Sequence, residues 1–397
     1  MNILVISHMY PYPGNSNNGI FVHQQNLELM RQGCNLTVLA PRPWAPYPIG
    51  FFNPRWRKFS SIPKVVNFDG IVARRPAYLV FPRGIGMASS GFRLNLAMRK
   101  HVAKLHKENP FSLIYAHTIL PDGQAGIFLK RYLGIPLVVT VHGKDVQQTA
   151  FRNNRCRQAI VDVVKEADMV VTVSTKLKRM LDQFTHLPWK SVAINNGFDS
   201  NKYLGIQPAG PAGTIISVSN LVQSKGLDLN LRAVAALRSK YPYIRYTVVG
   251  DGVEAGSLRQ LAQELKVQDM VTFTGQVPNK DVPSLLAKAR IFSLPSSMEG
   301  FGVAYLEAMA AGLPVIGCRG EGIADVVYSG ETGLLIEPNS LDSLVKALDQ
   351  LLGDPDGVRE MGLRARKLAL GNYSWQTNAS KMINLFEETI STADKGN

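Results

Sequence analysis

The sequence predicts an α/β protein built from two doubly wound domains that face each other across a cleft. The chain has 397 residues, which is too long for one ordinary core and suits two domains of about 200 residues each. In both halves, short continuous apolar runs alternate with helical patterns. Such runs are typical of strands in parallel sheets that helices cover on both faces.

Each half contains six runs that we expect to be buried strands. They lie at residues 3–7, 36–40, 113–116, 137–141, 169–173 and 192–194 in the first half, and at 215–219, 246–250, 270–274, 291–294, 315–317 and 333–336 in the second. Helical patterns between them include residues 21–32 and 125–133. The Gly- and Pro-rich stretch 201–213 is the expected linker. We therefore expect domains at 1–200 and 201–373, followed by a C-terminal helix within 374–397.

Composition narrows the class of protein. The three cysteines, Cys34, Cys156 and Cys318, lie far apart and indicate neither a disulfide framework nor a zinc site. The chain shows no signal peptide and no window with the roughly 20 apolar residues of a membrane span. We therefore expect a cytoplasmic protein, soluble or peripheral on the inner face of the membrane. The single Asp-x-Asp, at 354–356, is interpreted as a Pro-containing turn, and no metal site is expected.

Positive charge is concentrated in the first half of the chain. Residues 1–200 carry 25 Lys and Arg against 10 Asp and Glu, whereas residues 201–397 carry 19 against 20. Such a basic face suits nucleic acid, an anionic membrane surface or a phosphorylated acceptor, or it serves solubility alone. Segments 51–59 and 92–107 mix apolar side chains with cations, which favours lipid headgroups, although a core-packed helix with a solvated basic face fits 92–107 equally well. No nucleic-acid-binding module is recognisable, so no nucleic-acid partner is expected.

The most informative stretch runs from residue 295 to 308 and places two carboxylates around a Gly-rich turn. Gly300 and Gly302 let backbone N–H groups approach an anion at the start of a helix expected at 302–311. Glu307 falls about one turn into that helix, where its carboxylate can accept hydrogen bonds from two ribose hydroxyls. Glu299 stays on the loop, free to meet a second sugar. The pattern suits a sugar nucleotide, and an ordinary strand-loop-helix connection is the alternative.

Several motifs resemble, in order along the chain, those of the retaining glycosyltransferases of family 4, which have the GT-B fold. The strongest is Glu299-x7-Glu307 with Gly-Phe-Gly inside it and Glu-Ala-Met-Ala-Ala-Gly-Leu-Pro-Val-Ile after it. The others lie at residues 195–199, 217–221, 225–226, 249–252 and 273–275. The resemblance covers nearly the whole chain. It implies two Rossmann-like domains, an acceptor-side N-terminal domain, a C-terminal domain that binds a UDP- or GDP-sugar in the cleft, and a last helix that crosses back onto the first domain.

The resemblance also implies roles for individual residues of the C-terminal domain. Glu299 contacts the transferred sugar, Glu307 holds the ribose, and Lys225 supplies a cation for the diphosphate leaving group. The family commonly has Gly-Arg-Leu where this chain has Ser219-Asn220-Leu221. Either another cation substitutes, or Lys225 and backbone N–H groups hold the diphosphate. The implied donor-binding set is Gly19, Asn220, Lys225, Gly250, Gly275, Val277, Glu299, Gly300, Phe301, Gly302, Val303 and Glu307.

In the N-terminal domain, two histidines follow strands at the edge where open parallel sheets bind ligands. By resemblance, His117 contacts an outer hydroxyl of the donor sugar and joins Lys225 and Glu299 in the catalytic set. His142, with Gly143 and Asp145, resembles the acceptor-side corner. The other histidines, such as His101 and His106, are interpreted as surface residues.

The sequence thus predicts a retaining, metal-independent glycosyltransferase that needs no cofactor beyond its sugar-nucleotide co-substrate. The implied acceptor is a hydroxyl of a lipid-linked or other saccharide, as in a precursor of cell-surface polysaccharide. Retention means that this hydroxyl attacks from the face that the diphosphate leaves. Two alternatives stay open: a nucleotide-sugar epimerase of the same fold, which would consume no acceptor, and a non-catalytic protein that binds a sugar nucleotide or nucleic acid.

Overall fold

The computed structural model describes residues 1–44, 56–57, 59 and 61–395. The chain divides into two compact units, one of Met1–Asn195 with Trp375–Asn397 and one of Asn196–Ser374. Residues 201–213, the expected linker, lie inside the second unit, where the backbone N–H groups of Ala209 and Gly210 donate to the carbonyl of Ala287. None of the described helices has the length and apolar character that a bilayer crossing requires.

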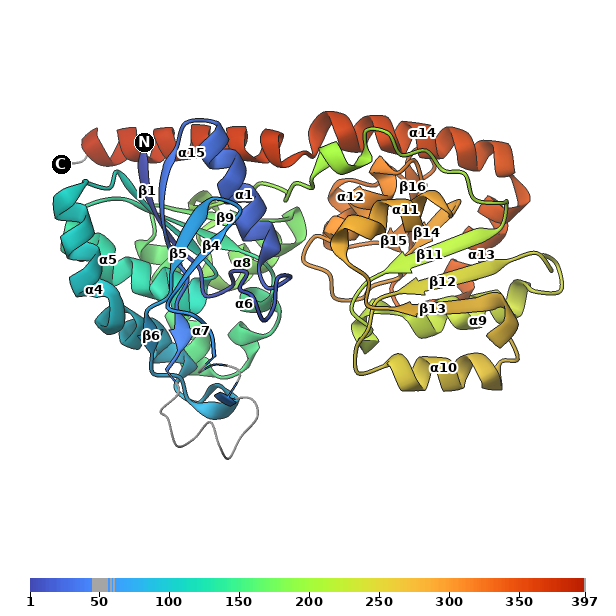
Figure 1. The fold of residues 1–397 in the computed structure, drawn as a ribbon, viewed down its shortest axis with the longest axis horizontal. Helices are drawn as coiled ribbons and strands as arrows, with labels where there is room; N and C mark the ends of the chain where they lie inside the picture. The colour runs from blue at the N-terminus through green and yellow to red at the C-terminus, as the bar shows by residue number, and fades with distance from the viewer. Residues whose placement is uncertain (45–55, 58, 60, 396–397) are drawn as a thin grey trace. The chain divides into compact units, whose positions relative to one another are not determined.

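The first unit is built on a sheet in the order β10-β9-β8-β7-β1-β2-β5-β4 (Figure 1). Its strands are β1 (Asn2–Ile6), β2 (Asn35–Leu39), β4 (Val65–Phe68), β5 (Ile71–Arg74), β7 (Leu113–His117), β8 (Leu137–Val141), β9 (Met169–Thr172) and β10 (Ser191–Ala193). All neighbours are parallel except β4 and β5. A separate parallel pair joins β3 (Arg42–Pro43) to β6 (Ala77–Tyr78). The carboxyl ends of β1, β7 and β8 therefore meet at one edge.

Helices flank this sheet, namely α1 (Ile20–Arg31), α4 (Ser90–Glu108), α5 (Gln124–Leu133), α6 (Lys144–Gln147), α7 (Asn154–Glu166), α8 (Thr175–Thr185) and α15 (Trp375–Lys395). Two of them begin at capping side chains that the sequence displays. Asn153 accepts from the N–H of Cys156 at the start of α7, and Ser174 accepts from that of Leu177 at the start of α8. Such caps satisfy N–H groups that have no partner within the helix.

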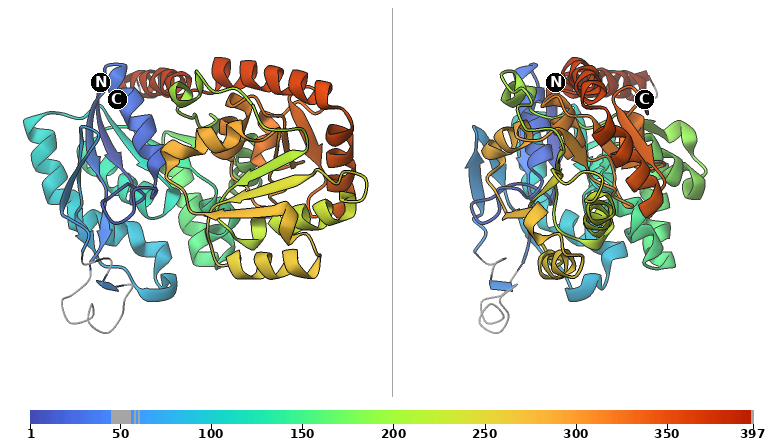
Figure 2. Two further views of the ribbon diagram at one scale, coloured as in Figure 1. Left: turned by 45° about the vertical axis from the view of Figure 1, so that its right-hand side comes forward. Right: turned by 90° about the vertical axis from the view of Figure 1, so that its right-hand side faces the viewer.

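The last helix, α15, returns to the first unit and packs against α1 (Figures 1 and 2). Met382 and Phe386 are fully buried in the same apolar core as Ile3 and Val5 of β1. The Gln25 amide donates to Asn378 Oδ1 at 2.6 Å inside this contact. The expected crossing of the C-terminal helix onto the first domain is confirmed.

The second unit contains a parallel six-stranded sheet in the order β13-β12-β11-β14-β15-β16. Its strands are β11 (Thr214–Val218), β12 (Arg245–Val249), β13 (Val271–Gly275), β14 (Ile291–Ser293), β15 (Val315–Cys318) and β16 (Gly333–Ile336). Its helices are α9 (Leu227–Leu237), α10 (Ala255–Glu264), α11 (Val282–Ala287), α12 (Val303–Ala310), α13 (Leu341–Gly353) and α14 (Pro355–Asn372). The chain crosses sides of β11 between β13 and β14, so the loops after β11 and β14 become neighbours.

All twelve expected strands are present, with ends within one residue of their expected positions. The hairpin of β4 and β5 was not expected, although Asp69-Gly70 between the two strands is a hairpin signal. Both residues have positive φ, 45° and 88°, as a two-residue turn of this kind requires. β4 is not a continuous apolar run, because it is an edge strand that alternates exposed and buried residues, with Val65 56% exposed.

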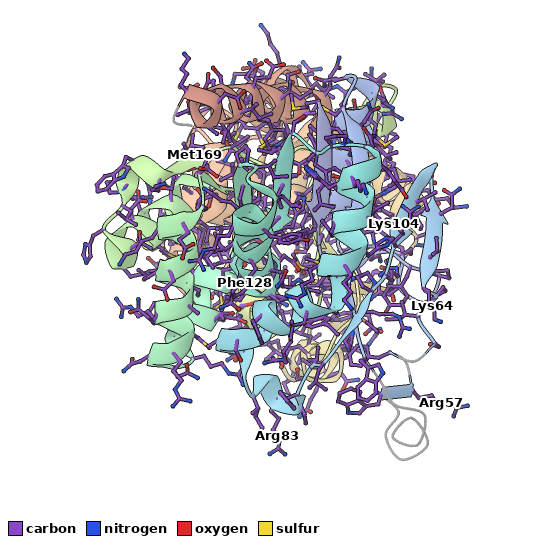
Figure 3. The ribbon with its side chains drawn as sticks, turned by 90° about the vertical axis from the view of Figure 1, so that its left-hand side faces the viewer. Arg57, Lys64, Arg83, Lys104, Phe128 and Met169 are labelled. Carbon is purple, nitrogen blue, oxygen red and sulfur yellow. The ribbon has the colours of Figure 1, made fainter. Side chains whose placement is uncertain are left out.

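The helix predicted at 92–107 is α4, and it packs on the core with Leu94, Met98 and Val102 fully buried. Phe92 and Leu96 stay about half exposed, at 47% and 49%. Of the aromatic and basic segment 51–59, only Trp56, Arg57 and Phe59 are among the described residues. Figure 3 shows Arg57, Arg83 and Lys104 on the outside of this unit.

Candidate active site

Lys225 and Glu299 form an ion pair at the carboxyl edge of the second sheet, between the loop after β11 and the loop after β14. Their side chains are only 19% and 15% exposed. The sequence predicted each as a site residue for a different part of the donor. The structure brings the predicted leaving-group cation and the predicted sugar-binding carboxylate into direct contact.

The backbone of these two loops is tied together. Gly226 has a φ of 65°, and a Cβ there would lie 2.4 Å from the carbonyl oxygen of Pro295. Beside it, the carbonyl of Ser224 accepts from the Ser297 N–H at 2.9 Å and from the Ser296 hydroxyl at 3.0 Å. Only glycine permits this approach, so Lys225 is held at a fixed distance from the Glu299 loop.

Two glycines of the predicted donor-binding set lie at neighbouring strand ends: Gly250 follows β12, and Gly275 ends β13. A Cβ on Gly250, whose φ is 132°, would collide with the carbonyl oxygen of Ser219 at 1.9 Å. The Gly250 N–H donates to the carbonyl of Gly275, the last residue of β13, at 2.9 Å. Val277 lies two residues further on and is half-buried. Gly250 therefore packs against the loop after β11, whereas the space beside Gly275 is open.

Gly302 caps α12 with a left-handed conformation, φ 89° and ψ 73°. The neighbouring Gly300 and Val303 leave the helix N-terminus accessible to an anion, whereas Phe301 is buried, with 2% exposed, and faces the core. Phe301 therefore supports the loop rather than offering its side chain to a ligand.

Glu321 is a residue that sequence reasoning missed in this loop cluster. Its buried carboxylate accepts from the backbone N–H of Glu299 at 2.6 Å. Next to it, Gly322 lies against the carbonyl of Gly300, at 2.2 Å from where a Cβ would stand. Glu321 follows β15, beside β14 in the sheet, so its position at a strand end was the signal that could have identified it.

Glu307 lies in α12 as expected, and its environment changes its chemistry. Burial raises the pKa of Glu307 to about 7, against the opposing effects of the Lys202 charge and a hydrogen bond from the Tyr203 hydroxyl. Tyr203, in the turn Ser200–Tyr203, is 1% exposed and was not predicted as a site residue. Nothing in the local sequence pairs these two residues.

Asn220 is exposed on the loop after β11. Its carbonyl accepts from the N–H of Val222, which tightens the turn.

Asp354, the first residue of Asp354-Pro355-Asp356, caps α14 by accepting from the N–H of Gly357 at 2.9 Å. Across the described part of the chain, no three His, Cys, Asp or Glu side chains are arranged as a metal site.

In the first unit, His117 ends β7 and His142 follows the adjacent strand β8, and the two rings stack with their planes 12° apart. His117 Nδ1 and His142 Nε2 are 3.1 Å apart and share a hydrogen bond. Burial lowers the pKa of His142 to about 3, and burial together with the His142 ring lowers that of His117 well below its ordinary value. Both rings are therefore neutral near pH 7.

The remaining predicted residues of this unit lie around the same strand ends. Gly143, φ 126°, precedes the short helix α6 as its N-cap, and the buried Asp145 within α6 accepts from the Ile119 N–H at 3.0 Å. Burial raises the pKa of Asp145 to about 6. Gly19 precedes α1 with φ 64°, where a Cβ would lie 2.2 Å from the carbonyl oxygen of Met9. The structure thus brings His117, His142 and Asp145 into one polar cluster.

His8 and Asp122 complete this cluster and were not predicted. His8 follows β1, and its Nδ1 lies 2.8 Å from the fully buried Asp122. Burial alone lowers the pKa of His8, but the charge of Asp122 and its hydrogen bond outweigh that effect and raise it. The strand-end rule applied to β1 would have identified His8, whereas Asp122 is found only through the fold.

One doubly wound unit holds a cation–carboxylate pair beside glycines at its strand ends. The other holds a neutral histidine pair at the ends of its strands. These are features of a sugar-nucleotide-dependent transferase of GT-B architecture. Two family profiles match: Glycosyltransferase Family 4 over residues 19–202 and Glycosyl transferases group 1 over residues 207–368. The chain belongs to glycosyltransferase family 4 and is a retaining glycosyltransferase that uses a nucleotide-sugar donor.

Three curated relatives illustrate the range of the family. A GDP-mannose-dependent alpha-(1-6)-phosphatidylinositol monomannoside mannosyltransferase of Mycolicibacterium smegmatis is 25% identical, over 84% of this chain and 88% of its own length. The putative teichuronic acid biosynthesis glycosyltransferase TuaC of Bacillus subtilis is 28% identical, over 88% of each. A D-inositol 3-phosphate glycosyltransferase of Corynebacterium aurimucosum is 30% identical, over 72% of this chain and 73% of its own.

A solved structure supports the fold. Sucrose-phosphate synthase from Thermosynechococcus elongatus superposes with a TM-score of 0.80, at 21% identity, over 99% of this chain and all of the other. Membership of the family makes transfer, rather than epimerisation or binding alone, the activity of this chain.

Proposed function

We propose that this chain transfers a hexose from a UDP- or GDP-sugar, without a metal ion, to a hydroxyl of a lipid-linked or cell-surface polysaccharide precursor. The observation that carries the donor half of the proposal is the Lys225–Glu299 pair inside the glycine-lined strand ends. Support for the acceptor class comes from the relatives, whose names specify a phosphatidylinositol monomannoside, teichuronic acid and an inositol phosphate.

On the donor side, Lys225 and the N–H groups at the start of α12 would stabilise the diphosphate, where negative charge grows as the bond to the sugar breaks. Glu299 would accept hydrogen bonds from hydroxyls of the transferred sugar, held by the contact of its N–H with Glu321. Glu307 would bind the ribose hydroxyls once it is ionised.

Retention of configuration at C1 determines the face from which the acceptor oxygen attacks. The bond between C1 and the phosphate oxygen breaks as the acceptor oxygen bonds C1 from the same face. The acceptor proton passes to the departing phosphate oxygen. His117, neutral and stacked on His142, would direct an outer hydroxyl of the donor sugar and is not required to carry this proton.

The basic first unit suits an acceptor at an anionic membrane surface. Phe92 and Leu96 are exposed on α4, beside the exposed cations Arg99 and Lys100. Apolar side chains among cations fit a headgroup layer.

Radiolabelled UDP- and GDP-sugars, each incubated with and without polyprenyl-phosphate-linked saccharides, test the proposal. We expect label to enter the acceptor with one donor, with retained configuration by NMR, and with EDTA present throughout. Lys225→Ala serves as the inactive control. Transfer that stops in EDTA and returns with magnesium would overturn the metal-independent mechanism, and transfer only to acceptors without lipid or polysaccharide character would overturn the acceptor class.

A further inference from the structure

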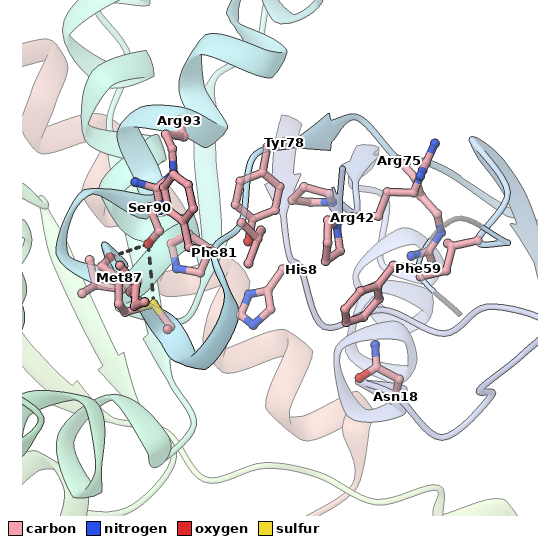
Figure 4. Close-up of a pocket in the computed structure, with 18 of the residues that line it drawn as sticks. His8, Asn18, Arg42, Phe59, Arg75, Tyr78, Phe81, Met87, Ser90 and Arg93 are labelled. Atoms are coloured by element: carbon pink, nitrogen blue, oxygen red, sulfur yellow. Dashed lines mark hydrogen bonds between the residues drawn. The ribbon is translucent and has the colours of Figure 1, made fainter. Parts of the chain in front are cut away.

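A pocket of about 320 Å³ opens in the first unit and is lined by both arginines and apolar side chains (Figure 4). It lies where the segments after β1, β2 and β5 approach the loop before α4. Asp and Glu do not contribute to its lining, whereas Arg42, Arg75, Arg93 and His8 do. The pocket therefore combines positive charge with an apolar wall.

Arg75 is a buried cation that has no carboxylate partner among the described residues. Its side chain lines the pocket although the residue is only 4% exposed. One terminal nitrogen donates to the carbonyls of Tyr10 and Pro11, while Nε has no hydrogen-bond partner. Burial lowers the pKa of Arg75 to about 10, which still leaves it charged near neutral pH.

Arg42 adds a second charge beside Arg75. Its positive charge contributes to the lowered pKa of Arg75, and its Nε is also buried without a partner. Within the described residues no carboxylate makes an ion pair with either guanidinium, and positions 45–55, 58, 60, 396 and 397 contain no Asp or Glu. Because a buried charge is costly without a counter-charge, an anionic ligand suits this pair, and guanidinium groups fit phosphate in particular.

The opposite wall is apolar and extends to the surface. Met87 lines the pocket, while Phe81 and Ile85 stand at its rim with 39% and 65% of their surfaces exposed. Arg93 holds this wall in place, since its three nitrogens donate to Leu79 O, Ser89 Oγ and Gly86 O, each at 2.9 Å. Arg93 is therefore a positioning residue, and Arg42 and Arg75 are the cations that remain for a ligand.

The pocket adjoins the strand-end cluster described above. His8 lines the pocket and binds Asp122, and Leu120 and Pro121, which precede Asp122, line it as well. A ligand seated here has one end near the carboxyl ends of β1 and β7 and an apolar end toward Phe81 and Ile85. We propose that this pocket binds the phosphate of a lipid-linked acceptor, with Arg42 and Arg75 on the phosphate oxygens and the Phe81–Ile85–Met87 wall against the first part of the lipid chain.

This inference rests on the proposed transfer to a lipid-linked acceptor, and its test is independent of turnover. Calorimetry on the full chain would compare octyl phosphate, octyl glucoside and inorganic phosphate. We expect octyl phosphate to bind at least about 10-fold more tightly than either of the others, because charge and apolar contact act together. Arg42→Gln should remove that preference, and Ile85→Ser should weaken both octyl compounds while leaving inorganic phosphate unchanged.

Arg179→Gln, which removes an exposed arginine of α8 in the same unit, is the matched control and should bind all three probes as the unsubstituted chain does. Arg75→Lys tests the guanidinium geometry while keeping the charge, and it should lose most of the preference for octyl phosphate. Equal binding of octyl phosphate and octyl glucoside would overturn the phosphate role, and equal binding of octyl phosphate and inorganic phosphate would overturn the lipid role. Equal losses in Arg42→Gln and Arg179→Gln would overturn the assignment to this pocket.

UDP and GDP titrations of the same variants separate this inference from the function on which it rests. Nucleotide affinity should be the same in all of them. If sugar is transferred to a lipid-linked acceptor but octyl phosphate is not bound selectively, the proposed role of the pocket is wrong and the proposed function is unaffected. Selective octyl phosphate binding without transfer to any lipid-linked saccharide would contradict the function instead.

Discussion

The ammonium group of Lys225 is paired with the carboxylate of Glu299, 74 residues further along the chain. Both side chains are largely buried, so each neutralises the other before a donor binds. In the proposed function, the diphosphate would bind Lys225 and the transferred sugar would bind Glu299. We therefore expect the pair to couple binding of the leaving group to binding of the transferred sugar.

This coupling predicts slower transfer when either partner is removed, without a loss of nucleotide affinity when Glu299 is removed. Lys225→Ala should lower the transfer rate about 100-fold or more, because it removes charge stabilisation from the leaving group. Glu299→Ala should also reduce turnover, yet its affinity for the bare nucleoside diphosphate should stay the same or increase, since Lys225 is released. Transfer assays measure the rates, and calorimetry with UDP and GDP measures the nucleotide affinity. Glu337→Ala, which breaks the exposed pair with Arg319, is the control. Weaker nucleotide binding in Glu299→Ala would argue against the coupling.

Glu307 predicts a pH dependence of donor binding. Burial raises its pKa to about 7, so the ionised form that best accepts two ribose hydrogen bonds is gained as the pH rises through neutrality. Nucleotide affinity should therefore increase from pH 6 to pH 8. Glu307→Gln should abolish this dependence and weaken binding at pH 8 by about 1 to 3 kcal/mol. A pH-independent affinity in the unsubstituted chain would remove the ribose role from Glu307.

The same carboxyl predicts an effect on stability with the opposite sign. A carboxyl whose pKa is raised on folding contributes stability at pH values below its unfolded pKa, and this contribution is lost as the pH rises toward the folded value. Here the range is from 4.5 to about 7. The Tm of Glu307→Gln should match that of the unsubstituted chain near pH 4.5 and exceed it at pH 8. Asp342→Asn, on an exposed helix position, should show no such trend.

The stacked histidines predict a loss of transfer with nucleotide affinity preserved. His117→Gln should slow transfer about 10- to 100-fold, the usual effect of losing a buried hydrogen bond to a reacting sugar. UDP and GDP titrations should be unchanged, because their proposed contacts lie in the second unit. Because folding lowers the pKa of both rings, their contribution to stability is present above pH 6.5 and is lost at lower pH, for His142 as the pH falls toward about 3. The exposed His101→Gln is the control, and equal kinetic losses in the two variants would contradict a role for His117.

Asn220 predicts a gain rather than a loss. It is exposed on the β11 loop, at the position where the family pattern that the sequence resembles has Arg. If charge on the diphosphate limits the reaction, Asn220→Arg should raise the transfer rate or tighten nucleoside diphosphate binding, and Asn220→Gln should do neither. A folded but inactive Asn220→Arg would show that this loop is built around the amide.

The charge of the first unit predicts salt-sensitive membrane binding. Sedimentation with anionic vesicles should be strong at low salt and fall steeply as salt shortens the Debye length to roughly 10 Å at 0.1 M. Replacing Arg99, Lys100 and Lys104 with Gln should weaken it, as should replacing Arg55, Arg57 and Lys58, while nucleotide affinity stays normal. A triple replacement of Arg232, Lys280 and Lys288 in the second unit is the matched control. If no sedimentation occurs at low salt, the membrane assignment fails.

Much of the fold was predictable because buried elements require a local pattern of apolar residues that can be recognised in the sequence. A strand of a parallel sheet contacts helices on both faces, so it must be apolar throughout, and runs such as 137–141 and 333–336 were placed without error. The edge hairpin of β4 and β5 was missed because one face of it meets solvent, which leaves only alternation and the Asp69-Gly70 turn as signals.

The site was predictable wherever a local motif carries it. Glu299, Gly302 and Glu307 belong to one strand-loop-helix segment whose backbone geometry follows from its glycines. By itself, the sequence determined the fold class and the family, and it singled out the segment that we propose faces a sugar nucleotide. It could not determine which distant side chains meet: Lys225 with Glu299, Tyr203 with Glu307, and His8 with Asp122 across 114 residues. Those contacts, and the presence of Arg42 and Arg75 in one pocket, depend on strand order. Strand order is set by long-range packing, which produces no periodic pattern in the sequence.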